Sequence, residues 1–141
     1  MRCSCQQTND YGPCPYITNV NQMGIENRNY REAIWTGEYL QMTSMCIPPC
    51  GDIGLEVHCD TDQLIRVECG RAVVKMGDCK ECLEKQRMIR KGDVVFVPAG
   101  TWHNVVNTEQ TPLKLSTVYA PPHHPHGTVH STKMDAQREE Y

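Results

Sequence analysis

His103 is the side chain whose surroundings point most directly to chemistry. It follows an apolar run at 94–97 and a short turn made by Pro98 and Gly100. Proline fixes one backbone angle and glycine accepts a positive φ, so the chain reverses and a second strand starts at Thr101. Side chains alternate along a strand, which places Thr101 and His103 on one face. If that face is the interior, the imidazole of His103 points into the fold. Imidazole can act as an acid, a base or a metal ligand.

Four of the six histidines lie between Pro121 and His130. A histidine-rich tract invites a metal-binding interpretation. The prolines in it indicate an extended connection, however, in which histidines are ordinarily solvated or bonded to backbone. The alternative is that one of them lines the mouth of a pocket as a general acid or base, because the pKa of imidazole lies near neutrality.

Nine cysteines are many for 141 residues, and their odd number leaves at least one outside any intramolecular disulfide set. Cys79 and Cys82 have the spacing of a zinc-binding pair, but no second pair follows at that spacing. Three interpretations stay open. The cysteines are reduced thiols, or they form disulfides or a second metal site, or exposed thiols sense redox conditions or cross-link copies of the protein.

Short apolar or alternating runs with turn residues between them position these side chains, and they favour an all-β sandwich or barrel over an α/β fold. The predicted strands are 30–36, 39–47, 55–58, 64–68, 72–76, 86–89, 94–97, 101–106 and 113–119. Residues 1–26 are polar and are interpreted as an irregular arm. Only 132–140 looks helical, with Thr132 and Asp135 as its cap.

Length and charge limit the possible functions. A chain of 141 residues is expected to form one domain, here 27–130, between the arm 1–26 and a tail 131–141. The net charge of −3 without a basic block disfavours nucleic acid and anionic membrane surfaces as partners. No stretch approaches the ~18 apolar residues of a membrane span, and the N-terminus has no apolar run, so we expect a cytoplasmic protein.

The spacing of Gly92, Pro98, Gly100, His103 and Asn107 resembles the second sequence motif of the cupin superfamily and matches it at all five positions. The chain as a whole resembles the small single-domain bacterial cupins of the type-2, RmlC-like kind, often labelled mannose-6-phosphate isomerase-like. Other segments that carry the resemblance are 34–37, 54–58, 119–122 and 127–130. The resemblance implies an all-β double-stranded β-helix, the cupin jelly-roll barrel, with an irregular N-terminal arm and a short C-terminal helix.

The resemblance also implies a metal site. The first cupin motif ordinarily supplies two histidines and a glutamate. Here Glu56 stands at the first histidine, His58 at the second, and Gln63 replaces the glutamate. With His103, the implied ligands of a divalent metal are Glu56, His58, Gln63 and His103. Two imidazoles and a carboxylate bind Mn, Fe, Ni or Zn, and an amide oxygen adds a weak fourth ligand.

Alternatives remain at this site. Asp60 or Asp62 could supply the carboxylate, although they lie in a predicted turn where aspartate commonly bonds its own backbone. The pocket could also hold no metal. From the resemblance, His126 and His130 are the candidates in the histidine tract for an acid or base at the pocket mouth.

Three functions are compatible with these residues. The first is a metal-dependent enzyme acting on a small oxygenated or carbohydrate-like molecule by isomerase, lyase or dioxygenase chemistry. No glycine-rich loop or basic cluster supports a sugar-phosphate site. The second is a module that binds a small ligand or a metal without turnover, and the third is a cysteine-cross-linked structural protein such as a spore-associated one. The resemblance implies a homodimer, since cupins of this size commonly pair through sheet edges. An arm like 1–26 can cover an edge strand or exchange with a partner.

Overall fold

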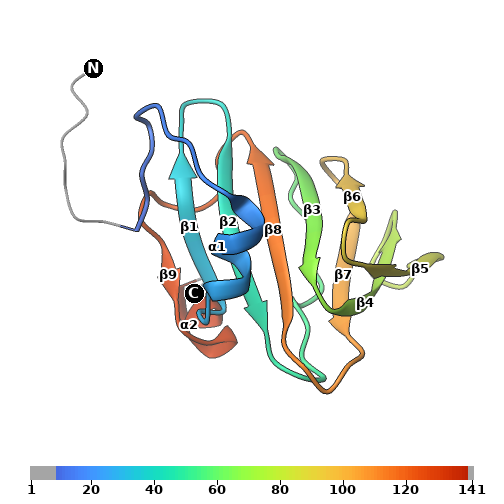
Figure 1. The fold of residues 1–141 in the computed structure, drawn as a ribbon. Helices are drawn as coiled ribbons and strands as arrows, with labels where there is room; N and C mark the ends of the chain where they lie inside the picture. Colours follow the sequence, from blue (N-terminus) through green and yellow to red (C-terminus); the bar gives the residue numbers. More distant parts are fainter. Residues whose placement is uncertain (1–8, 140–141) are drawn as a thin grey trace.

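Alternation of inward and outward side chains builds a jelly roll from two antiparallel sheets, as predicted (Figure 1). The structure is a computed structural model and describes residues 9–139. Its strands are β1 (Arg31–Thr36), β2 (Gln41–Ile47), β3 (Asp62–Cys69), β4 (Arg71–Gly77), β5 (Lys85–Arg90), β6 (Val94–Val97), β7 (Trp102–Asn107), β8 (Leu113–Ala120) and β9 (Val129–His130). Eight of the nine predicted strands are confirmed within a few residues, and the predicted strand 55–58 is replaced by a looser pairing.

The larger sheet has the order β6-β3-β8-β2-β1-β9 and the smaller one the order β5-β4-β7. Residues 51–58 run antiparallel along the free edge of β7, through isolated bridges between Asp52 and Val106 and between Glu56 and His103. This segment extends the smaller sheet, because each bridge carries backbone hydrogen bonds of 2.8–3.1 Å to β7. Since edge strands expose unpaired backbone groups, the segment also covers that edge.

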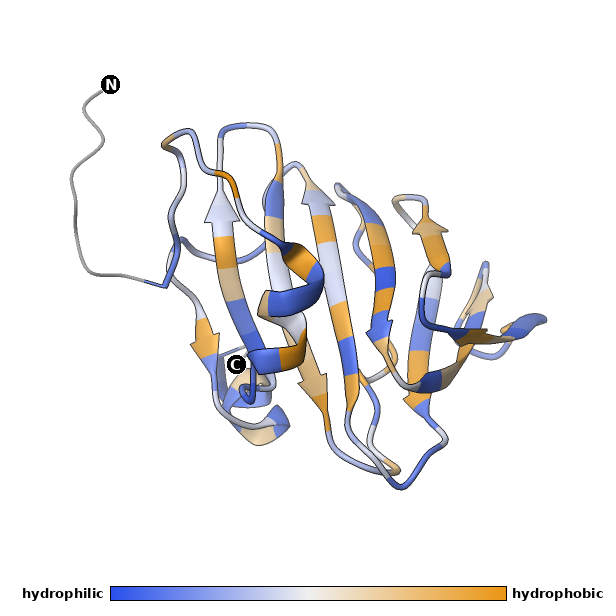
Figure 2. Cartoon of the chain, in the orientation of Figure 1, coloured by the Kyte–Doolittle hydropathy of each residue, from blue (hydrophilic) through white to orange (hydrophobic). Residues whose placement is uncertain are grey.

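The interior between the sheets has a polar end and an apolar end. Across β2, β8 and β3, the register places Gln41, Tyr119 and Gln63 side by side at one end. Four residues further along β2 the aligned side chains are Met45, Leu115 and Val67. All six are buried, and Figure 2 shows the alternation of hydropathy along the strands. The apolar end supplies the hydrophobic stabilisation, about 1.5–3 kcal/mol for each large side chain, and leaves the polar end available for a site.

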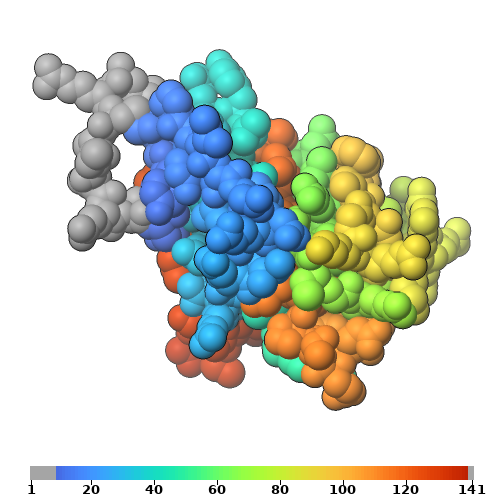
Figure 3. All heavy atoms as spheres, viewed as in Figure 1, coloured from blue at the N-terminus to red at the C-terminus, as the bar shows by residue number. Residues whose placement is uncertain are grey.

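Part of the arm that the sequence predicted to be irregular is a helix, α1 (Val20–Glu26). The side chain of Asn19 caps it by accepting a hydrogen bond of 2.9 Å from the backbone N–H of Gln22. The sequence signal was weak, because a seven-residue polar segment shows no clear helical periodicity. In Figures 1 and 3, α1 lies across the outer face of the larger sheet, where it contacts β2, β3 and β8.

Asp10 ties the segment before α1 to the rest of the fold. Its buried carboxylate accepts hydrogen bonds from the backbone N–H groups of Gly12, Thr36 and Gly127, at 3.0, 2.9 and 2.9 Å. The hydroxyl of Thr36 donates a fourth, at 2.6 Å. One carboxylate thus joins the N-terminal segment, the end of β1 and the connection that leads to β9.

The predicted C-terminal helix is present as α2 (Lys133–Glu139). Thr132 and Asp135 exchange side chain–backbone hydrogen bonds of 3.2 Å, so the predicted cap is confirmed. The predicted end at residue 140 lies outside the described residues. Within 9–139, neither helix has the length and apolar character needed to cross a bilayer.

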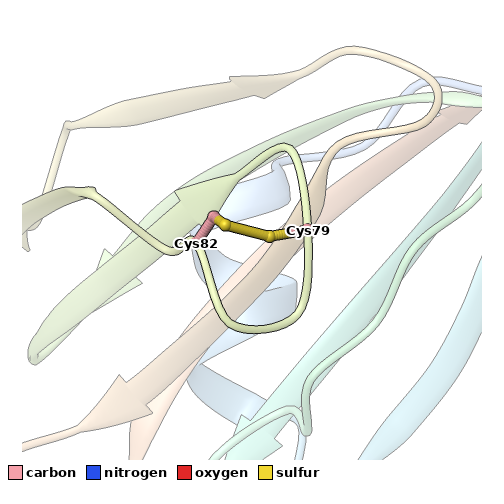
Figure 4. Close-up of a disulfide and its surroundings, with 2 residues drawn as sticks. All are labelled: Cys79 and Cys82. Atoms are coloured by element: carbon pink, nitrogen blue, oxygen red, sulfur yellow. A yellow bond between two sulfur atoms is a disulfide. The ribbon is translucent and has the colours of Figure 1, made fainter.

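Cys79 and Cys82 form a disulfide in the loop between β4 and β5 (Figure 4). The two cysteines with the spacing of a zinc-binding pair are therefore bonded to each other. Free thiols among the described residues are Cys46, which is half-buried, and the exposed Cys50, Cys59 and Cys69. Cross-linking through the exposed thiols stays a prediction.

Candidate functional site

Backbone pairing brings Glu56 and His103 together. Their main-chain groups exchange two hydrogen bonds of 2.9 Å, and residues directly opposite in an antiparallel pair point to the same face. His58 lies two residues beyond Glu56, hence on that face too. The predicted turn fixes its position, because Gly100, at φ +84°, donates its N–H to the carbonyl oxygen of His58 at 2.8 Å.

Three of the four predicted ligands form one cluster. The Oε2 atom of Glu56 lies 3.1 Å from Nε2 of His58 and 3.9 Å from Nε2 of His103. One donor atom from each of the three residues falls within 4.8 Å of the others. The arrangement supplies the two imidazoles and one carboxylate that divalent transition metals bind.

Two of the four predicted ligands have a buried acceptor atom without a partner. Nδ1 of His103 lies 3.0 Å from the carbonyl oxygen of Thr101, which can only accept, so the proton is on Nδ1 and Nε2 carries a lone pair. This Nε2 is buried and has no hydrogen-bond partner among the described residues, and the same holds for Oε1 of Gln63. A buried acceptor without a partner costs about 1–3 kcal/mol. A cation bound by the cluster would satisfy Nε2 of His103, so Glu56, His58 and His103 fit a metal ion.

The protonation states also suit metal binding. Burial alone would raise the pKa of Glu56, but the hydrogen bond from His58 and the charge of Arg31 outweigh it and lower that pKa. Burial lowers the pKa of His103. The site therefore holds an ionised carboxylate and a neutral imidazole at neutral pH, which are the forms that coordinate metals.

The fourth predicted ligand, Gln63, lies on the opposite sheet. It points inward from β3, with 4% of its surface exposed, and pairs in register with Tyr119 of β8. The Tyr119 ring lies 5.8 Å from the His58 ring between centroids. The alternative carboxylate Asp62 instead accepts a hydrogen bond of 2.9 Å from the backbone N–H of Ala99 and supports the turn before β7.

The two candidate histidines of the tract lie outside the cluster. His126 is 46% exposed, and its Nε2 is 2.8 Å from the carbonyl oxygen of Gly12. His130 is buried between Arg31, at 3.3 Å from Nδ1, and Glu139, at 2.6 Å from Nε2. Neither makes a described contact with Glu56, His58 or His103.

Their neighbours in the tract, His123 and His124, lie beside His58 and Tyr119. The ring of His123 is 4.2 Å from that of His58, and the ring of His124 is 5.1 Å from that of Tyr119. Gln41 holds both in place. Its Oε1 accepts from the backbone N–H groups of His123 and His124, at 3.2 and 2.9 Å, and its Nε2 donates to the His124 carbonyl at 2.8 Å.

Sequence reasoning missed Arg31, Gln41, Tyr119 and the role of His123. The sequence held one signal for Gln41 and Tyr119, namely a polar group at an inward position of a strand. Alternation ordinarily places apolar side chains at such positions. A polar residue at an inward position predicts either a hydrogen-bond network or a binding site.

Acid should destabilise the metal-free protein through His124. Burial, with the charge of Arg31 next, lowers the pKa of His124 to about 2, and its Nε2 has no hydrogen-bond partner among the described residues. The unfolded chain takes up this proton near pH 6.5 and the folded chain does not, so stability is lost as pH falls below about 6.5. From pH 7.5 to 5.5 this residue accounts for up to about 1.4 kcal/mol.

The measurement is urea unfolding of chelator-treated protein at both pH values. His124→Gln should reduce the loss between the two pH values by that amount. Equal losses in wild type and His124→Gln would contradict the assignment to His124.

Comparison with known proteins identifies a cupin domain in this chain. A family model described as a cupin domain matches residues 43–119. The uncharacterized protein YrkC of Bacillus subtilis (strain 168) is 52% identical over 127 residues, which cover 90% of this chain and 68% of YrkC. The uncharacterized protein L612 of Acanthamoeba polyphaga mimivirus is 37% identical over 115 residues, which are 81% of this chain and 70% of L612.

Solved structures have the same architecture. The crystal structure of BH2720 from Bacillus halodurans aligns with a TM-score of 0.91 at 48% identity, covering 92% of this chain and 98% of BH2720. A predicted oxalate decarboxylase from Thermotoga maritima aligns at 25% identity with a TM-score of 0.52, over 59% of this chain and 67% of its own.

Proposed function

The chain belongs to the cupin family. From this premise we propose that it binds one divalent metal ion through Glu56, His58 and His103, and that the amide oxygen of Gln63 is the fourth ligand. The observation that carries the proposal is the pair of buried acceptors, Nε2 of His103 and Oε1 of Gln63, that have no partner among the described residues. They complement a carboxylate and an imidazole already in place.

We further propose that the site acts on a small oxygenated molecule. A divalent cation, when bound, polarises an oxygen atom of a substrate. The chain's own residues provide the pocket. Tyr119 is buried, and burial raises the pKa of its hydroxyl, so Tyr119 stays protonated. His123 lies over His58 on the exposed side, and Gln41 fixes the loop that carries it.

The reaction type stays a proposal within the isomerase, lyase and dioxygenase classes. A predicted oxalate decarboxylase is among the similar structures, which supports a small carboxylate or related molecule as substrate. A homodimer and a cytoplasmic location also stay proposals. The alternative of a binding module without turnover would use the same ligands.

Elemental analysis of protein purified without a histidine tag or chelator tests the metal proposal. We expect about one equivalent of Mn, Fe, Ni or Zn in the wild type and in His126→Ala, whose side chain lies outside the cluster. After chelation, adding the metal at about 100 times its Kd should restore roughly 2.7 kcal/mol of stability. Protein without metal, and without a rise in Tm when each of the four ions is added, would refute the proposal.

A further inference from the structure

Arg31 is a buried cation beside the proposed metal ligands whose hydrogen-bonding capacity the fold does not use up. Only 3% of its surface is exposed, and its Nε has no hydrogen-bond partner among the described residues. Buried guanidinium groups are ordinarily paired and fully hydrogen-bonded, because an unpaired buried donor is costly. An unpaired Nε–H next to a binding site therefore requires an explanation.

The neighbouring carboxylates pair with Arg31 incompletely. Oε1 of Glu56 lies 3.9 Å from Nη2, too far for a hydrogen bond, while Oε2 of the same group faces His58 and His103. Glu139 reaches Arg31 only through His130, whose Nδ1 is 3.3 Å from Nη1.

The space beside Arg31 is suited to a small anion. A cavity of about 430 Å³ is lined by Arg31, Glu56, Tyr30, Ile53, Lys133 and Gln137. Lys133 pairs with Asp52 at the rim of the cavity. Arg31 bonds to His130 and Tyr119 through its other nitrogens but keeps a buried Nε–H without a partner among the described residues. Glu56 lines this cavity and also belongs to the cluster with His58 and His103, so a molecule held by Arg31 lies next to the proposed metal site.

We propose that Arg31 binds a carboxylate of the substrate, so that the site takes small carboxylic acids with a second oxygen function one or two carbon atoms away. The inference rests on the proposed metal site, which would bind that second oxygen. Arginine suits this role because its planar guanidinium is permanently charged and matches a carboxylate. Arg31 is thus a specificity residue and not a metal ligand.

Calorimetric titration of zinc-loaded protein with malonate and with acetate tests the proposal. We expect malonate to bind wild type at least about tenfold more tightly than acetate, because its second carboxylate reaches Arg31. In Arg31→Gln the preference should fall to below about threefold, with one equivalent of zinc retained. Arg28→Gln removes an exposed arginine and should behave as wild type.

The outcomes separate the two proposals. If malonate keeps its preference in Arg31→Gln, it chelates the metal with both carboxylates and the role of Arg31 is refuted. If Arg31→Gln loses its zinc, Arg31 serves only as the counter-ion of Glu56, which also refutes it. If wild type binds no zinc, the metal proposal fails separately.

Arg31→Lys keeps the charge and loses the planar guanidinium, so it should fold and show an intermediate preference for malonate. An unchanged preference would count against a guanidinium–carboxylate pair.

Discussion

Replacing His58 and His103 together by alanine is expected to lower metal affinity by about a thousandfold or more, leaving the purified protein metal-free. The two imidazoles supply two of the three clustered donor atoms, and the remaining carboxylate of Glu56 would bind a cation only weakly. Elemental analysis and competition with a chelating dye measure the loss. The double variant should lose the metal-induced rise in Tm as well.

His124→Ala is the matched control for this variant. It removes a half-buried imidazole that contacts Tyr119 and His123 and is not part of the cluster. It should keep one equivalent of metal. Metal retained in the double variant would relocate the site to the thiols or to the histidine tract, and metal lost from His124→Ala alone would show that the pocket needs its whole lining.

The sequence predicted that Glu56, His58 and His103 lie together, through local rules and the family motif combined. Glu56 and His58 are two residues apart on one extended segment, and a proline–glycine turn fixes the start of the strand that carries His103. The family motif then aligned the two segments. The structure adds the reason for their proximity, which is the antiparallel bridge between Glu56 and His103.

Arg31 could not be predicted in the same way. Its partner His130 is 99 residues away in the sequence, in a strand of two residues that is too short to show a periodic pattern. Alternation places an arginine on the solvated face of a strand unless a buried partner is known. Long-range pairing between β1 and β9, which only the folded chain specifies, decides the position of Arg31.

The directions of the side chains in the histidine tract could not be predicted from the sequence either. Its composition indicated that some of its imidazoles could reach the pocket, but not which ones. The hydrogen bonds that the backbone N–H groups of His123 and His124 donate to Gln41 decide that, and they join segments more than 80 residues apart. An irregular connection has no strand or helix periodicity, so the sequence does not predict which way its side chains point.

Gln63→Glu should have opposite effects on the two forms of the protein. Without metal, it buries a second carboxylate near the polar end that already holds ionised Glu56, at a position only 4% exposed. We expect the free energy of unfolding of chelator-treated protein to fall by about 2–4 kcal/mol. With metal, a second anionic oxygen replaces a neutral one, and affinity should rise by roughly 10- to 100-fold.

Urea unfolding of chelated protein and dye competition with Mn²⁺ measure the two effects. Gln86→Glu makes the same chemical change at an exposed position of β5 and should alter neither quantity by much. Gln63→Met removes the amide oxygen while roughly keeping side-chain volume, and should weaken metal binding by less than tenfold. If Gln63→Glu lowers stability but leaves affinity unchanged, Gln63 lines the pocket without contacting the metal, and its unpaired Oε1 instead belongs to the part of the site that binds substrate.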